Sequence, residues 1–97
     1  MNHKYLYPAV FIPLDDGAYG VKFPDFAACI TQGDSFENAI YMAKDALSAM
    51  LTAMEDDKDE IPKASIPYSK EGAIISFLEV DTLEYRRVAI MPKRYMS

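Results

Sequence analysis

A single long amphipathic stretch constrains the fold of this chain more than any other feature. From Phe36 onward, apolar residues recur at intervals of three and four: Ala39, Ile40, Ala43, Ala46, Leu47, Met50, Leu51 and Met54. This spacing predicts one continuous apolar stripe on an α-helix. Polar residues fall off the stripe, at Glu37, Asn38, Lys44, Asp45 and Ser48. Asp34 is expected to cap the first turn while Glu37 reaches back to it, and the apolar face must then cover another layer.

The layer beneath this helix is predicted to be a small sheet. Residues 5–13 are aromatic and β-branched, which indicates a buried strand, and Pro8 places that strand at an edge or a bulge because proline lacks an N–H. A turn at residues 15–17 precedes an alternating run at 19–23, which together predict a hairpin. A third strand at about residues 28–32 would close a three-stranded meander.

The chain after the helix predicts a loop and one further strand. Residues 55–60 are all charged and are expected to be solvated, and two prolines in residues 61–67 forbid further helix. Residues 73–80 alternate as a strand, with Ile74, Ser76, Leu78 and Val80 on one face. The expected fold is therefore α+β with the order β-β-β-α-β, in a domain of residues 1–82 followed by a basic segment of residues 83–97.

Composition excludes several classes of function. The 97 residues suffice for one domain, and no apolar run is long enough to span a bilayer, so we expect a cytoplasmic protein with no membrane role. Fifteen acids against ten bases give a formal charge of −5, which argues against a domain-wide nucleic-acid binder and suits a basic partner.

The sequence offers no convincing catalytic, cofactor or metal site. Cys29 is the only cysteine, so a disulfide within the chain and a thiolate zinc cluster are both excluded, and we expect a small buried side chain there. His3 is the only histidine, and it is expected at the surface. The acids of residues 55–60 lack the glycine and ligand spacing of a calcium loop.

Short motifs at the ends of the predicted strands and helix occur in the same order as in one known family. They are Tyr7-Pro8, Asp15-Asp16-Gly17, Phe23-Pro24-Asp25-Phe26, Ala28-Cys29, Thr31-Gln32-Gly33-Asp34 before the helix, Ile61-Pro62, and Glu84-Tyr85-Arg86-Arg87. In this order they resemble the HicB antitoxins, over about residues 5–87. The resemblance implies a partial ribonuclease H-like fold. Residues 5–13 contain no Asp or Glu, whereas ribonuclease H chemistry needs a carboxylate there, so we expect no nuclease activity.

The same resemblance implies a partner and a mechanism. The partner would be a HicA-like toxin, a small basic ribonuclease whose RNA-binding face the antitoxin covers. Exposure and charge suggest the contact residues Asp15, Asp16, Tyr19, Asp25 and Phe26. Turn formation explains the two turn acids at least as well as contact does, and the phenylalanine could equally belong to the core.

The basic segment of residues 83–97 suggests an alternative function, the binding of DNA. Many relatives continue into a module that binds operator DNA, and residues 88–93 resemble the first ribbon of a ribbon-helix-helix unit. Two further helices do not fit after Pro92, so the chain is either shortened or a variant without a DNA reader, and DNA binding is expected only with the missing module. The residues concerned are Arg86, Arg87, Val88, Ile90, Lys93 and Arg94. They could instead form a solvated tail or a pairing strand in a homo-oligomer, and a transcriptional autorepressor remains the second hypothesis.

Overall fold

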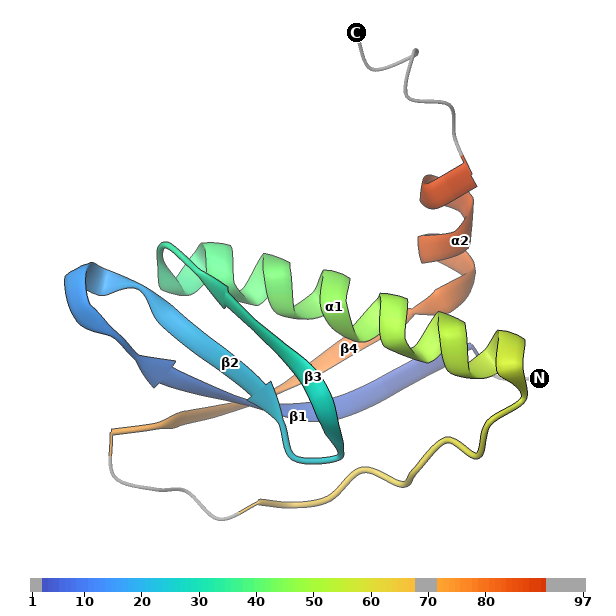
Figure 1. The fold of residues 1–97 in the computed structure, drawn as a ribbon, viewed down its shortest axis with the longest axis horizontal. Coiled ribbons are helices and arrows are strands. Elements are labelled where there is room, and N and C mark those ends of the chain that lie inside the picture. The colour runs from blue at the N-terminus through green and yellow to red at the C-terminus, as the bar shows by residue number, and fades with distance from the viewer. Residues whose placement is uncertain (1–2, 68–71, 91–97) are drawn as a thin grey trace, which may run out of the picture.

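The computed structural model describes residues 3–67 and 72–90, and the statements below concern these residues. Three strands come first, β1 (Lys4–Pro13), β2 (Tyr19–Phe23) and β3 (Phe26–Gly33), with a short 3₁₀ turn, η1 (Asp15–Gly17), between the first two. The long helix α1 (Phe36–Asp57), strand β4 (Ile74–Asp81) and helix α2 (Thr82–Ile90) follow (Figure 1). The predicted β-β-β-α-β order and α+β class are confirmed, with α2 as an addition.

The four strands form one antiparallel sheet in the order β3-β2-β1-β4. Strand β1 is therefore interior, and the expected edge position is wrong for the strand as a whole. Pro8 pairs with Phe77 of β4, whereas pairing between β1 and β2 starts only at Val10. Proline is tolerated because this half of β1 has a registered neighbour on one side only.

One face of the sheet packs under α1 and forms the core. Its buried apolar residues are Tyr7, Ala9, Phe11, Val21, Phe23, Phe26, Cys29, Leu78 and Val80 from the strands and Ala39, Ala43, Leu47 and Leu51 from α1. The predicted helical stripe and the burial of Cys29 are thus confirmed. Ser48 was expected off the stripe, but it is also buried. Neither described helix has the length and apolarity needed to cross a membrane.

Helix α1 begins one residue later than expected. The cap is Ser35, whose hydroxyl accepts a hydrogen bond from the Asn38 N–H at 3.0 Å. The Asn38 side chain reaches back to accept from the Asp34 N–H at 2.9 Å. The arrangement resembles a capping box, with Ser35 and Asn38 in place of Asp34 and Glu37, but the returning bond comes from the N–H of the residue before the cap.

The segment after β4 is a helix, and the prediction of a ribbon strand at Val88 and Ile90 is wrong. Asp81 caps this helix, because its Oδ1 accepts hydrogen bonds from the Leu83 and Glu84 N–H groups at 2.9 and 3.3 Å. An acidic side chain at this position satisfies otherwise unpaired N–H groups and favours the helix start. Of the predicted tail residues, Lys93 and Arg94 lie outside the described residues.

Candidate functional site

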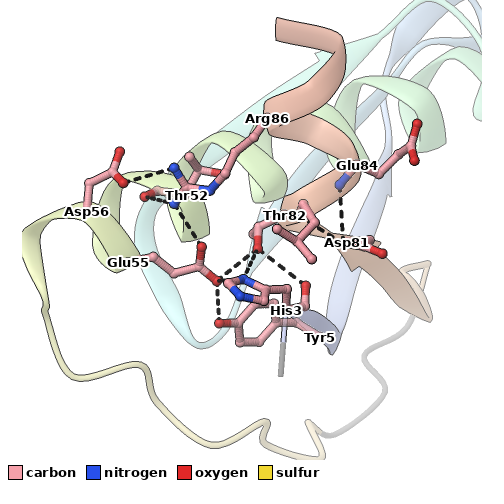
Figure 2. Close-up of polar contacts among 10 residues, drawn as sticks. His3, Tyr5, Thr52, Glu55, Asp56, Asp81, Thr82, Glu84 and Arg86 are labelled. Carbon is pink, nitrogen blue, oxygen red and sulfur yellow. Dashed lines mark hydrogen bonds and ion pairs between the residues drawn. The ribbon is translucent and has the colours of Figure 1, made fainter. Parts of the chain in front are cut away.

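Five side chains meet where β1, the end of α1 and the start of α2 come together (Figure 2). Glu55 is at their centre: its Oε2 accepts hydrogen bonds from the Tyr5 hydroxyl at 2.6 Å and the Thr82 hydroxyl at 2.8 Å, and its Oε1 accepts from Arg86 at 2.9 Å. The His3 Nδ1 lies 3.4 Å from Oε2. We call His3, Tyr5, Glu55, Thr82 and Arg86 the Glu55 cluster.

Two expectations from the sequence are wrong at this cluster. Glu55 was expected in a solvated acidic run, yet only 12% of its side chain is exposed. His3 was expected at the surface, but it is partly buried, with its Nδ1 3.2 Å from the Thr82 hydroxyl. The helical period carries a signal for Glu55, which continues the i, i+4 row of Leu47 and Leu51 toward the core.

The cluster strongly favours the ionised form of Glu55. Burial alone would raise the pKa of this carboxyl, but the hydrogen bonds from Tyr5, Arg86 and Thr82 outweigh it and lower the pKa to about 2. Burial, and then the hydrogen bond to Glu55, raise the pKa of Tyr5 to about 12. The carboxylate is thus charged, paired and largely removed from solvent.

The geometry of the Glu55 cluster favours a role in stabilising the fold over a role in catalysis. A threonine, a histidine and a carboxylate are together, but Thr82 and Glu55 both contact the same ring nitrogen of His3, so no proton path runs through the ring. Thr82 is also completely buried and beyond the reach of a substrate. In residues 3–67 and 72–90, no three His, Cys, Asp or Glu side chains come together in a way that could hold a metal ion. The cluster therefore holds α2 and the N-terminal strand against α1.

The structure separates the five predicted partner-binding residues. Asp15 and Asp16 are exposed in η1 at the tip of the β1–β2 hairpin. Tyr19 packs against Phe36, with ring centroids 5.1 Å apart. Asp25 accepts hydrogen bonds from the N–H and hydroxyl of Ser65, both at 3.2 Å, and so ties down the loop after α1.

Phe26 belongs to the core. It is buried, and its ring meets the Tyr7 ring edge-on with centroids 4.7 Å apart. The Tyr7 hydroxyl donates a hydrogen bond to the Pro62 carbonyl, which fastens the same loop. Of the five predicted contact residues, only Asp15 and Asp16 are thus exposed to a partner.

The described bases of the C-terminal segment are already paired. Arg86 contacts Asp56 at 2.9 Å in addition to Glu55, and it donates a hydrogen bond to the Thr52 carbonyl. Arg87 pairs with Glu84 on the exposed side of α2. Val88 is exposed, and Ile90 ends the helix. The domain boundary at residue 82 stays a prediction, although these pairs tie the start of α2 to α1.

A hollow of about 320 Å³ lies between α1, β4 and α2. Its lining is mixed: Tyr41, Lys44, Asp45, Ser48, Glu79, Val80, Asp81, Glu84, Tyr85 and Val88. Two of its acids have structural partners, because Asp81 caps α2 and Glu84 pairs with Arg87. The hollow owes its shape to the position of α2, and therefore to the Glu55 cluster.

Comparison with known proteins identifies the family. The sequence model of the HicB_like antitoxins of bacterial toxin-antitoxin systems matches residues 7–89. The chain belongs to this family. One HicB relative, Antitoxin HicB 1 of Photorhabdus laumondii, is 41% identical over 66 residues, which are 63% of this chain and 43% of that protein. The HicB-like chain thus spans less than half the length of the curated relatives it matches.

Solved structures share the fold of this HicB-like chain. A chain of a toxin-antitoxin complex from Streptococcus pneumoniae superposes with a TM-score of 0.74 and 24% identity, covering 84% of this chain and 72% of that one. The N-terminal domain of the antitoxin HicB from Burkholderia pseudomallei gives a TM-score of 0.69 and 19% identity, covering 79% and 99%. At these identities the likeness establishes the fold alone.

Proposed function

We propose that this HicB-like chain is an antitoxin that binds a HicA-like, mRNA-cleaving ribonuclease and covers its RNA-binding face. The observation that carries the proposal is the match of the antitoxin family over residues 7–89, nearly the whole described chain. The fold shared with a chain of a toxin-antitoxin complex supports it. Because the RNA cleaved by such a toxin is cytoplasmic, we place the antitoxin in the cytoplasm.

The proposed mechanism is binding without catalysis. Strand β1 carries no carboxylate where ribonuclease H chemistry would need one. The one buried carboxylate of the Glu55 cluster is occupied by Tyr5, Thr82 and Arg86. The surface of the bound chain would exclude RNA from the toxin sterically. Its net charge of −5 would speed the encounter with a basic protein.

Within this proposal, Asp15 and Asp16 form the acidic contact with the toxin. They are exposed at one end of the molecule, at the turn between β1 and β2, while the acidic end of α1 lies at the other (Figure 1). Asp16 has a positive φ of 64°, a backbone conformation that Asn tolerates as well as Asp. Both charges can therefore be removed without straining the turn.

We expect the double variant Asp15→Asn/Asp16→Asn to bind the toxin roughly three- to ten-fold more weakly, since exposed charge pairs each contribute up to about 1 kcal/mol. The loss should fall mainly on the association rate and shrink at high salt. Surface plasmon resonance with the toxin at two salt concentrations measures both effects.

The matched control removes two exposed acids from the opposite end, as Asp57→Asn/Asp59→Asn. It removes the same two negative charges as the η1 variant but should leave the affinity nearly unchanged. Equal weakening by both pairs would show that only net charge matters, and would remove the η1 acids from the proposed contact.

No observation in the described residues favours the DNA-binding alternative. The segment expected to form a ribbon is helical up to Ile90, and Arg86 is engaged with Glu55 and Asp56. Operator binding through Arg86 would therefore require its contacts with Glu55 and Asp56 to break.

A further inference from the structure

The outer edge of β4 is a strand edge with which no described strand pairs. The sheet order β3-β2-β1-β4 leaves β4 bonded to β1 on one side only. Edge strands are normally protected by lysine, proline or a bulge, because an unpaired edge invites further pairing. Strand β4 has none of these: its sequence, IISFLEVD, contains no lysine or proline, and its register with β1 is regular from Ile74 to Asp81. We call the outer side of β4 the free edge.

The hydrogen-bond pattern shows which backbone groups point out from the free edge. The Thr82 N–H donates to the His3 carbonyl at 2.9 Å, and these two residues continue the β1–β4 register by one step. In an antiparallel pair, residues bonded to the partner strand alternate with residues whose N–H and C=O point away from it. Counting back from Thr82, every second residue is thus bonded to β1. The residues between them in the body of β4 direct both groups outward: Ile75, Phe77 and Glu79.

A strand added to the free edge would meet apolar side chains on both faces of the sheet. Ile74 and Phe77 lie on opposite faces, since side chains alternate along a strand, and they are 42% and 44% exposed. Glu79 is the one charged residue between Ile74 and Val80. In a chain with a net charge of −5, this carboxylate favours a basic segment over a second copy of the chain.

The free edge ends at the hollow between α1, β4 and α2. Glu79, Val80 and Asp81 of β4 line this hollow, and its lining residues include four acids and one base. Asp45 of α1 is one of these acids, and in residues 3–67 and 72–90 it has no ion-pair partner. The lining also includes the buried Val80 and Ser48. A long basic side chain fits this site, because its apolar stem can pack on the buried residues while its charge meets the acids.

The start of β4 lies at the end of the sheet that carries η1. Ile74 is in register with Phe11, two residues before β1 ends at Pro13, and η1 follows with Asp15 and Asp16. A segment paired with the free edge therefore runs from the hollow toward the acids that are proposed to contact the toxin. One partner can thus occupy all three places.

We propose that an extended, basic segment of the ribonuclease adds to the free edge as a fifth strand, with one long basic side chain in the hollow. Backbone hydrogen bonds with Ile75, Phe77 and Glu79 would supply affinity, and the acids of the hollow would supply specificity. This inference rests on the proposed antitoxin function and deepens it, because it names the surface by which the chain holds the toxin.

Residue-resolved amide exchange on the full chain, alone and with the purified toxin, tests the pairing directly. In the isolated chain the Phe77 amide should exchange quickly, whereas the Leu78 amide, bonded to β1, should be protected. The toxin should slow exchange at Phe77 and Glu79 roughly ten-fold or more. Unchanged exchange there in a complex that does form would overturn the proposal and leave the antitoxin function standing. Protection of the same amides in the concentrated chain alone would assign the edge to a second copy, and would also overturn it.

Two variants at Phe77 separate the backbone contribution from that of the side chain. Phe77→Ala removes the ring and keeps the N–H, while Phe77→Pro removes both the ring and the outward N–H without breaking a bond to β1. Phe77→Pro should bind the toxin roughly ten-fold more weakly than Phe77→Ala, because a carbonyl of the added strand loses its donor. Circular dichroism checks that both variants fold, and the exchange measurement decides if Phe77→Pro does not. Equal affinities of two folded variants would overturn the proposal.

A lysine on each outer strand distinguishes the free edge from the rest of the sheet. Phe77→Lys should weaken toxin binding roughly ten-fold, because it sets a cation against a basic segment. Ile30→Lys changes an exposed apolar residue of β3, at the opposite edge, and should stay within about two-fold of the parent chain. Weakening by Ile30→Lys but not by Phe77→Lys would overturn the proposal. A toxin that fails to bind even the parent chain would contradict the antitoxin function itself, and this proposal with it.

Discussion

Replacing Gly33 by alanine is expected to cost about 3 kcal/mol of folding free energy and to lower the melting temperature by roughly 12–24 °C. Gly33 ends β3 directly against the first turns of α1. A Cβ at this position would lie 2.4 Å from the Ala39 backbone nitrogen, 2.5 Å from its Cα and 2.8 Å from the Asn38 carbonyl carbon. All three are backbone atoms, so relief requires the helix to move off the sheet. Thermal and urea unfolding followed by circular dichroism measures the loss.

Gly20→Ala is the matched control for this prediction. Gly20 lies in β2, and a Cβ there would meet only the Leu14 Cδ1 at 3.7 Å, an ordinary contact. We expect its effect to stay within about 0.5 kcal/mol, because the new methyl group displaces nothing. If Gly33→Ala proved as stable as Gly20→Ala, the close approach of β3 and α1 described here would be incorrect.

Replacing Glu55 by glutamine is expected to destabilise the fold by about 2 kcal/mol at neutral pH. The hydrogen bonds that lower its pKa from 4.5 to about 2 correspond to about 3 kcal/mol, and glutamine retains part of this by bonding with the same neighbours. The lost interactions join β1 and α2 to α1, so α2 should loosen first. Urea unfolding, with hydrogen exchange on residues 82–88, measures both effects.

The pH dependence identifies the carboxylate as the cause. Because the folded-state pKa of Glu55 is depressed, its stabilisation is fully present above pH 4.5 and is lost as the pH falls toward 2. The stability difference between the parent chain and Glu55→Gln should therefore shrink over this window. Asp57→Asn, an exposed position on the same helix, should differ little from the parent throughout. A difference that stayed constant down to pH 2 would show that the charge of Glu55 is not what stabilises the fold.

The fold was largely predictable because its signals are local and periodic. The apolar spacing from Ala39 to Met54 fits only a helix, and the alternation in residues 19–23 and 73–80 indicates strands. Errors came where a long-range contact or a neighbouring cap decides the outcome. Asp34 and Ser35 are both good caps, and in the structure it is the Ser35 hydroxyl that accepts the hydrogen bond from the Asn38 N–H. Val88 lies in a helix that Asp81 caps. The pattern of residues 88–93, from which the ribbon was predicted, does not include that cap.

The site was less predictable, since its partners are distant in sequence. Glu55 meets Tyr5, fifty residues earlier, and Arg86, thirty-one residues later. Because residues 55–60 are all charged, Glu55 was expected to face solvent. Its i, i+4 spacing from the buried Leu51 is the sequence signal that it faces inward. Asp25 was selected by charge as a partner contact, but its hydrogen bonds to Ser65 give it a structural role. The motifs shared with HicB antitoxins identified the family because they mark joints of the fold.

The central claim is that this HicB-like chain neutralises a ribonuclease by covering it. The direct measurement is the cleavage rate of an RNA substrate by a fixed amount of the HicA-like toxin, titrated with the purified chain. Cleavage should fall in proportion to added chain and stop at equimolar amounts, with no RNA lost when the chain is present alone with magnesium. A toxin that stays fully active in the presence of excess folded chain would contradict the account.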